Sequence, residues 1–217
     1  MTAREPRHPA RNILTGITAL IMVCGGAAGA APAHAATPTC GTSCTTVFPQ
    51  QTGDLDVGAV QGSVAQAGQP IILFPAAPTP AEDFTLLYLA TAGTLYTDGI
   101  VGPAVGLTWP SDNGYEYEYT PDGAPSGLCA GLAVTAANGV PVTLQPCGVT
   151  AKTVWITLSV DTIGGYQPLI NGSDTVTAAP YVLTAGGVKG ALITQQLYLV
   201  AGTFAPAQMW QNITGLL

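Results

Sequence analysis

A short stretch of this chain recurs, and the recurrence limits the folds that the chain can adopt. Residues 68–84 and 139–155 align without a gap, and six pairs of equivalent positions carry the same residue or a similar one. These pairs are Gly68 with Gly139, Pro70 with Pro141, Ile71 with Val142, Leu73 with Leu144, Pro75 with Pro146 and Phe84 with Trp155. A looser third copy runs from Gly190 to Trp210. Three short copies of one unit that cannot bury its own apolar face predict a fold with pseudo-threefold symmetry.

The pattern within the copies favours strands over helices. Apolar residues alternate in short blocks that Gly and Pro residues bound, and no stretch predicts a long amphipathic helix. The predicted strands include Val57–Gln61, Pro70–Phe74, Thr85–Leu89, Thr94–Thr97, Tyr115–Tyr119, Val140–Leu144, Val154–Val160, Thr175–Thr177, Ala191–Gln195 and Leu197–Val200. We therefore expect one all-β domain over residues 55–217, with an insertion at residues 98–123 and an irregular segment at residues 36–54 before it.

Residues 1–35 have the features of a signal peptide. Three arginines precede an apolar stretch, residues 13–31, and Ala33-His34-Ala35 matches the small-residue cleavage pattern. We expect cleavage after Ala35 and a secreted, extracellular protein. A membrane anchor is the less favoured alternative, because the apolar run is short and ends in a cleavage signal.

Four cysteines follow the leader: Cys40, Cys44, Cys129 and Cys147. An even number of cysteines in an exported chain predicts two disulfides, which can be connected in three ways. The spacing favours Cys40–Cys44 and Cys129–Cys147. We expect no metal site, because residues 36–217 contain no histidine and thiols pair with each other in an oxidising compartment.

Charge and composition exclude several classes of function. Residues 36–217 hold two lysines, no arginine and eleven acidic residues, for a net charge of −9. A polyanion needs basic residues to neutralise it, so we expect neither nucleic acid nor an anionic membrane as a partner. The absence of histidine also removes Ser–His and Cys–His nucleophiles. We found no cofactor motif.

A row of alternating residues, Tyr115-Glu116-Tyr117-Glu118-Tyr119, stands out within the predicted insertion. On a strand the tyrosines share one face and the two glutamates share the other. The tyrosines could form a contact platform, but one buried face and one solvated face is the simpler interpretation. Glu116 and Glu118 point the same way, so they cannot lie on opposite sides of a glycosidic bond, and we expect no enzyme.

The segment from Gly127 to Trp155 resembles ricin-type β-trefoil lectin domains, the Gln-x-Trp repeat family. Such repeats carry a Gly-x-Cys start, an Asn-Gly turn, an apolar-x-Leu strand, a second cysteine and a closing Gln-x-Trp. Here these elements are Gly127/Cys129, Asn138-Gly139, Val142-Thr143-Leu144, Cys147 and Thr153-Val154-Trp155, while Gln208-Met209-Trp210 keeps the full closing motif. The resemblance implies a secreted bacterial protein with a disulfide-stapled β-trefoil, in which Phe84, Trp155 and Trp210 meet in the core.

The resemblance also implies where sugar would bind. The family uses an aspartate after the first cysteine, an aromatic ring after the apolar-x-Leu strand and an amide near Gln-x-Trp. When Leu197 is aligned with Leu144, the third copy supplies Gln196, Tyr198 and Gln208 but has Leu183 in place of the aspartate. We therefore expect the third copy to be the main site.

The other two copies match this pattern less well. The first copy offers Phe74 and, with an insertion in the alignment, Asp56. The second copy has Gly131 and Gln145 in place of the aspartate and the ring, so we expect no site there. The predicted function is a non-catalytic carbohydrate-binding module without a cofactor. The alternative is an exported structural or protein-binding module, including a β-trefoil protease inhibitor, whose sugar sites are degenerate.

Overall fold

A computed structural model describes residues 44–50, 55–59, 64–75, 80–159, 164–186, 190–200 and 203–214. All of these residues fall within one compact unit, residues 32–217. The helices and strands, in chain order, are β1 (Thr45–Pro49), β2 (Leu55–Ala59), β3 (Ile71–Pro75), β4 (Phe84–Thr91), α1 (Ala92–Thr97), α2 (Pro103–Gly106), β5 (Asn113–Tyr119), β6 (Leu128–Leu132), β7 (Val142–Pro146), β8 (Trp155–Thr157), β9 (Leu169–Asn171), β10 (Tyr181–Ala185), β11 (Leu192–Gln196), β12 (Leu199–Val200), β13 (Thr203–Phe204) and β14 (Trp210–Thr214). Short 3₁₀ turns lie at Pro80–Glu82, Pro121–Gly123 and Pro206–Gln208.

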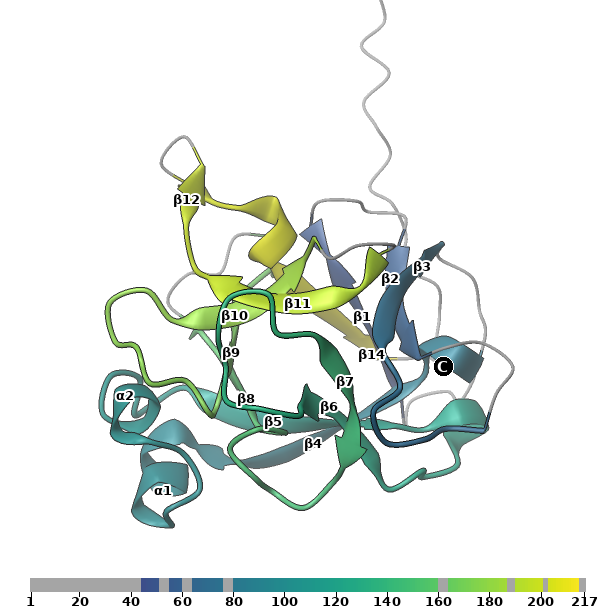
Figure 1. The fold of residues 1–217 in the computed structure, drawn as a ribbon, viewed down its shortest axis with the longest axis horizontal. Coiled ribbons are helices and arrows are strands. Elements are labelled where there is room, and N and C mark those ends of the chain that lie inside the picture. The colour runs from purple at the N-terminus through teal and green to yellow at the C-terminus, as the bar shows by residue number, and fades with distance from the viewer. Residues whose placement is uncertain are drawn as a thin grey trace, which may run out of the picture. The chain divides into compact units, whose positions relative to one another are not determined.

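Six strands form a closed barrel (Figure 1). Antiparallel pairs connect them in the order β9, β8, β5, β4, β1 and β14. The barrel closes where Gln167, just before β9, bridges Trp210 at the start of β14. Each of these two residues donates its backbone N–H to the carbonyl of the other at 2.9 Å. Closure of this kind leaves no unpaired edge strand in the barrel.

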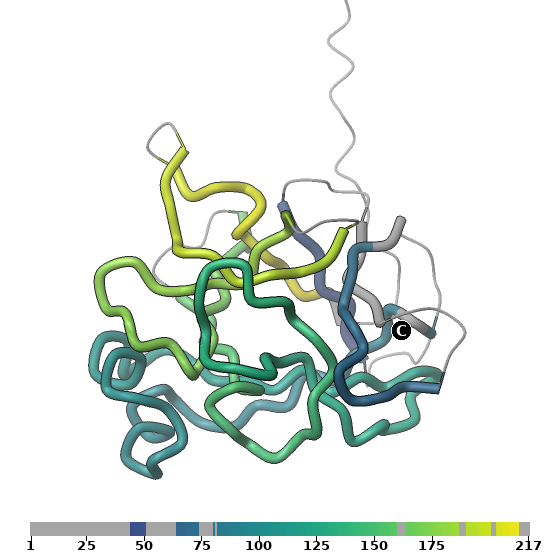
Figure 2. Tube along the Cα trace, in the orientation of Figure 1, coloured from purple at the N-terminus to yellow at the C-terminus, as the bar shows by residue number. Residues whose placement is uncertain are grey.

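Three hairpins, β2–β3, β6–β7 and β10–β11, pack together beside the barrel; Figure 2 follows the chain through them. Isolated bridges join every pair of hairpins: Pro70 with Thr143, Ile72 with Ala191, and Pro141 with Ile193. Each repeat unit therefore contributes two barrel strands and one hairpin. The repeat units are β1–β4, β5–β8 and the set β9, β10, β11 and β14. Six barrel strands with three such hairpins make a β-trefoil, as the sequence predicts.

The repeated glycines lie just before the second strand of each hairpin, three residues before Ile71 and Val142 and two residues before Leu192. Gly68, Gly139 and Gly190 have backbone φ angles of +85°, +77° and +78°, a region that glycine adopts without strain. The N–H of Gly68 donates to the carbonyl of Leu144 at 2.7 Å, and the N–H of Gly139 donates to that of Thr194 at 2.8 Å. Thr194, and not Leu197, is thus equivalent to Leu144. The sequence alignment of the third copy, which pairs Leu197 with Leu144, is therefore displaced by three residues.

The predicted aromatic core is confirmed. Phe84, Trp155 and Trp210 are each 1% exposed and belong to one apolar cluster inside the barrel. The indole N–H of Trp155 donates to the carbonyl of Ala130, and that of Trp210 donates to the carbonyl of Leu183, both at 2.9 Å. Both carbonyls belong to the middle residue of a hairpin strand, β6 or β10, so each tryptophan fastens the hairpin of its own repeat unit to the barrel.

The strand that we predicted at Thr94–Thr97 is wrong, because these residues belong to helix α1. Thr91 caps the helix by accepting the N–H of Thr94 on its hydroxyl. Ala92 and Leu95, three residues apart, share one buried helix face and join a second apolar cluster with Ile156 of β8. The cluster extends to Ile170 and Val182 of β9 and β10, so this helix covers apolar residues outside the barrel interior. A helix this short shows too few turns for its periodicity to be read from sequence.

Two segments that we expected to lie outside the repeats supply barrel strands. β5 lies within residues 98–123, yet it pairs with β4, β6 and β8. β1 lies within residues 36–54, and it pairs along its whole length with β14. The strand predicted at Thr175–Thr177 is absent from this described segment. Sequence alone could not identify β1, because its partner β14 lies more than 160 residues away.

The predicted disulfide between Cys129 and Cys147 is present, with a Cα–Cα distance of 5.0 Å. It ties β6 to the residue that follows β7, at the base of the second hairpin. Cys44 is also disulfide-bonded. Its predicted partner, Cys40, lies outside the described residues. No helix in the part of the chain that the structure describes is long and apolar enough to cross a membrane.

Candidate functional site

An open depression lies where the second and third repeat units meet. It is lined by residues from two segments that are far apart in the sequence: Asn138, Gly139, Gln195, Gln196 and Tyr198. The Asn138-Gly139 turn closes the second hairpin, whereas the other three residues lie at the end of β11 and just after it. Of these five, the sequence predicted Gln196 and Tyr198 as site residues.

The turn of the second unit is hydrogen-bonded to β11. The side-chain carbonyl Oδ1 of Asn138 accepts the backbone N–H of Gln196 at 3.1 Å. The N–H of Gly139 donates to the carbonyl of Thr194, whose hydroxyl in turn donates to the carbonyl of Ala137 at 2.7 Å. These bonds hold the Asn138-Gly139 turn against β11, and they leave the Nδ2 group of Asn138 able to donate to a ligand.

Gln208, the third predicted residue of this site, lies beneath the surface. Its side chain is 0% exposed. Its Oε1 accepts the N–H of Tyr198 at 3.1 Å, and its Nε2 donates to the carbonyl of Gln196 at 2.9 Å and to the hydroxyl of Thr184 at 3.2 Å. We predicted that this amide would contact a ligand. Because its hydrogen bonds are made inside the protein, it positions the segment 196–198 instead.

The exposed groups of the depression are one aromatic ring and several amides. Tyr198 is 46% exposed. Gln196 is exposed and Gln195 half-buried, and neither side-chain amide has a hydrogen-bond partner among the described residues. An amide carries both donors and acceptors, and an aromatic ring offers an apolar face. Together they match a ligand with hydroxyl groups and an apolar face.

The corrected register changes which residue holds the family's ring position in the third unit. Gln195 follows Thr194 as Gln145 follows Leu144, and the two glutamines lie opposite Val182 and Cys129 in their hairpins. Tyr198 therefore lies three residues beyond the expected ring position. It still faces the depression, because the chain between β11 and β12 stays beside the Asn138-Gly139 turn.

The predicted pair in the first unit, Asp56 and Phe74, lies at directly opposite positions of β2 and β3. Asp56 is equivalent to Cys129 in the second hairpin and to Val182 in the third, so Gly58, and not Asp56, is equivalent to Gly131, where the family carries its aspartate. The side chains of Asp56 and Phe74 lie outside what the structure describes, so their role as an alternative site stays a prediction.

The second unit differs from the third in ways that fit our expectation of no site. Gln145, the equivalent of Gln195, donates its Nε2 to the hydroxyl of Thr143 at 2.7 Å. Gly131 packs closely, because a Cβ atom there would lie 2.9 Å from the carbonyl oxygen of Lys152. This position therefore cannot carry the aspartate of the family without a shift of the backbone.

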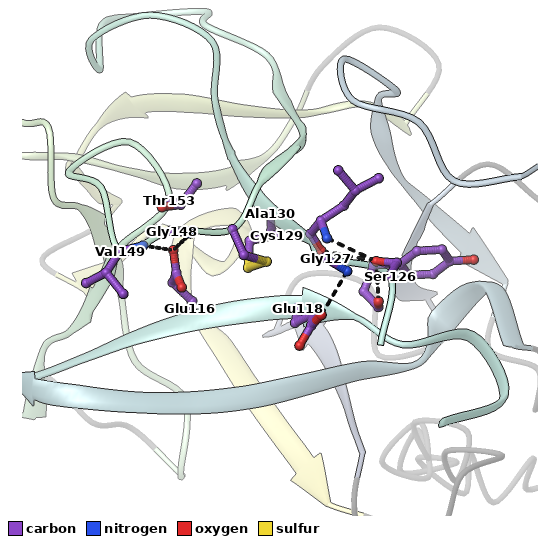
Figure 3. Close-up of a disulfide and its surroundings, with 12 residues drawn as sticks. Glu116, Glu118, Ser126, Gly127, Cys129, Ala130, Gly148, Val149 and Thr153 are labelled. Atoms are coloured by element: carbon purple, nitrogen blue, oxygen red, sulfur yellow. Dashed lines mark hydrogen bonds between the residues drawn. A yellow bond between two sulfur atoms is a disulfide. The ribbon is translucent and has the colours of Figure 1, made fainter. Parts of the chain in front are cut away.

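The two glutamates of β5 brace the disulfide hairpin (Figure 3). Glu116 is 2% exposed, and its Oε1 accepts the N–H groups of Gly148 and Val149 at 3.4 and 2.9 Å. Val149 needs this support, because its φ of +53° is unusual for a β-branched residue. Glu118 accepts the N–H of Gly127 at 2.9 Å. The expected solvated glutamate face is thus only partly solvated, because Glu116 is buried and Glu118 is half-buried, while the tyrosines pack on the core as expected.

Sequence reasoning missed Asn138 and Gln195 as site residues. The Asn-Gly turn was visible as a repeat feature, but nothing in the sequence indicated that it lies against β11. Among the described residues, no group of three or more His, Cys, Asp or Glu side chains is arranged to hold a metal ion.

No protein-family model matches the sequence, and no curated protein matches it either. Solved structures match the fold at 12% identity. They include ThreeFoil, a designed threefold-symmetric protein (TM-score 0.54, covering 79% of this chain and 98% of that one), and the Rhizoctonia solani agglutinin (TM-score 0.52, 80% and 95%).

A lectin from Polyporus squamosus, bound to a sialylated influenza-binding epitope, also matches (TM-score 0.51, 12% identity), over 79% of this chain and about half, 49%, of its own. An exo-β-1,3-galactanase from Clostridium thermocellum matches at 11% identity and a TM-score of 0.54, and this chain spans only 30% of it. The chain has the β-trefoil fold of these lectins, and at such low identity the similarity establishes the fold alone.

Proposed function

We propose that this protein is a secreted, non-catalytic carbohydrate-binding module that binds glycans in the depression between its second and third repeat units. The observation that carries this proposal is the exposed ring of Tyr198 beside the amides of Asn138, Gln195 and Gln196. A ring that stacks on the C–H face of a sugar and amides that bond its hydroxyls are the groups a neutral sugar site needs. Lectins among the solved structures with this fold support the same function.

The non-catalytic part of the proposal rests on the acidic groups. A glycosidase needs two carboxyl groups on either side of the scissile bond. No acidic residue lines the depression, and Glu116 and Glu118 on β5 accept backbone N–H groups. With no carboxylate to accept strong hydrogen bonds, we expect weak glycan binding, roughly millimolar or about 4 kcal/mol.

Secretion and leader removal are proposed from the basic, apolar and Ala-x-Ala parts of residues 1–35. Intact-mass analysis of the protein recovered from the culture medium tests this. We expect a chain that begins at Ala36 and takes up no alkylating reagent unless it is first reduced. A retained leader or a free thiol would contradict the proposal.

A glycan array, followed by calorimetric titration against galactose-, mannose- and xylose-type oligosaccharides, tests sugar binding. Tyr198→Ala should abolish binding without unfolding the protein, because Tyr198 lies at the surface, 46% exposed, and supplies the stacking surface. Gln145→Ala in the second unit is the control and should leave affinity unchanged. Binding that survives Tyr198→Ala would move the site to Asp56 and Phe74.

A protein-binding role is the second candidate function, and the β12–β13 hairpin favours it. Leu199 and Val200 are 59% and 49% exposed, and the hairpin has no counterpart among the residues described in the other two repeat units. Exposed neighbouring apolar residues are typical of protein contact sites. If no glycan binds the wild-type protein, and if Leu199→Ser with Val200→Ser then abolishes capture of a defined protein ligand, this candidate replaces the first.

A further inference from the structure

The depression between the second and third repeat units has no charged lining. Its five lining residues are Asn138 and Gly139 of the turn, the two glutamines Gln195 and Gln196, and Tyr198. The lysine that the structure describes, Lys152, donates its ammonium group to the carbonyl of Ala133 at 3.0 Å, in the second unit. Gln196 pairs with Tyr181 at the open end of the β10–β11 hairpin, which is opposite the turn that joins the two strands.

The hydrogen-bonding groups that remain in the depression are neutral and of both kinds. Asn138 keeps its Nδ2 donor, because its Oδ1 is bonded to Gln196. Gln195 and Gln196 keep whole amides, each with two donors and one acceptor oxygen. The amide of Gln208, which lies underneath, is bonded to the protein and cannot turn outward to meet a ligand. Such a set matches hydroxyl and acetamido groups, which also donate and accept.

We propose that this depression selects uncharged sugars and discriminates against acidic ones such as sialylated, sulfated or uronic glycans. The inference rests on the proposed function and adds the chemical class of the ligand. A carboxylate or sulfate placed here would lose water and find no cation among the described residues that line the depression, and charge-assisted hydrogen bonds are the strong ones that such groups need. Residues 36–217, the part of the chain proposed to be secreted, also carry a net charge of −9, so their field opposes an anion on approach.

The first test compares matched glycans on the wild-type protein. Calorimetry measures affinity for a neutral oligosaccharide and for the same oligosaccharide with a terminal sialic acid or a sulfate, at low and high salt. We expect binding of the acidic form to be about tenfold weaker at low salt and to recover partly at high salt, as screening predicts. Affinity for the neutral form should not depend on salt.

Equal or tighter binding of the acidic form would overturn the selectivity and leave the sugar-binding function standing. If neither form binds at millimolar concentration, and the glycan array shows no other ligand, both proposals fall together. The two failures are therefore distinguishable.

The second test uses charge variants at equivalent positions of two repeat units. Gln195→Lys places a cation in the depression, whereas Gln145→Lys makes the same change in net charge in the second unit. We expect Gln195→Lys to raise affinity for the acidic glycan about fivefold at low salt, which is the size of a solvated charge pair at close range. Gln145→Lys should leave the ratio of acidic to neutral affinity near that of the wild type.

Equal gains from both lysine variants would show that whole-molecule charge, and not the lining of the depression, sets the selectivity. Gln195→Glu adds an independent measurement, because it should weaken the acidic glycan further while Gln145→Glu does not. Circular dichroism of each variant confirms folding. A folded Gln195→Lys protein whose ratio of acidic to neutral affinity does not rise above that of the wild type would contradict the proposal.

Discussion

Single buried side chains hold the candidate site in place. Gln208 shows this best, because one amide fixes the backbone of both Gln196 and Tyr198. Its equivalent in the second unit, Thr153, also bonds locally, accepting the N–H of Thr150 at 3.2 Å. The residue two places before the core tryptophan thus shapes the loop above it in both units.

Gln208→Ala should weaken glycan binding although the side chain does not touch the depression. It removes three hydrogen bonds and leaves buried groups without partners, which costs about 1–3 kcal/mol of unfolding free energy. Urea unfolding measures that cost, and calorimetry measures the accompanying loss of affinity. Thr153→Ala is the matched control: it should lower stability while affinity stays unchanged. Equal affinity losses in both variants would argue against a positioning role.

Asp174 should make stability depend on pH. Burial raises the pKa of this carboxyl above its ordinary 3.8, although the N–H groups of Val176 and Tyr181 donate to it. A raised pKa in the folded state favours the protonated form, so the contribution to stability is full below the unfolded pKa and is lost as pH rises through the folded pKa. Relative to Asp174→Asn, the wild-type free energy of unfolding should therefore fall as pH rises from 3 upward. A constant difference between the two proteins would contradict this.

At the scale of elements, the hairpins carry the differences among the repeat units. The second hairpin has a disulfide at its base and two glutamates of β5 below it, whereas the third has the added β12–β13 hairpin after it. The barrel strands are arranged in the same way in each unit, as two antiparallel strands of the barrel. Variation in the hairpins and their connections therefore changes the surface without disturbing barrel closure.

Removing the hairpin disulfide should lower stability without changing the fold. Cys129→Ala with Cys147→Ala frees a loop whose ends are 18 residues apart in sequence, which costs about 3 kcal/mol by loop entropy. Denaturant unfolding of the double variant measures this cost. Glycan affinity should persist, because the depression lies at the other end of this hairpin. A variant as stable as the wild type would show that the glutamate hydrogen bonds alone hold the hairpin base.

Across the whole molecule, the three repeat units resemble one another closely in their core residues and much less in their surface residues. The interior repeats as triplets such as Ile71, Val142 and Leu192, which each begin the second strand of a hairpin and pack in the same core. Outside, Gln145 donates to Thr143 whereas its equivalent Gln195 lines the depression, and the third unit adds Tyr198. A shared core fixes the fold, while each unit's surface is free to diverge.

Truncation of the core tryptophans tests this shared interior. Trp155→Ala and Trp210→Ala should each cost about 3–5 kcal/mol, because each removes a large buried ring and one indole hydrogen bond. Denaturant midpoints report the loss. If both midpoints barely move, the two rings do not support a common core, and the interpretation of the interior is wrong.

The sequence by itself was enough to predict the repeats, the three core aromatics, the Cys129–Cys147 bond and the β-trefoil. The repeats and the aromatics depend on local patterns that recur in each copy, such as the glycines Gly68, Gly139 and Gly190. The disulfide follows from the spacing of two cysteines in the second copy, and the resemblance to the Gln-x-Trp repeat family implied the β-trefoil. Only the tertiary structure decided that β1 and β5 belong to the barrel, that Thr94–Thr97 is helical and that Asn138 meets Gln196. Each of these depends on contacts between residues distant in sequence, whose burial outweighs local preference.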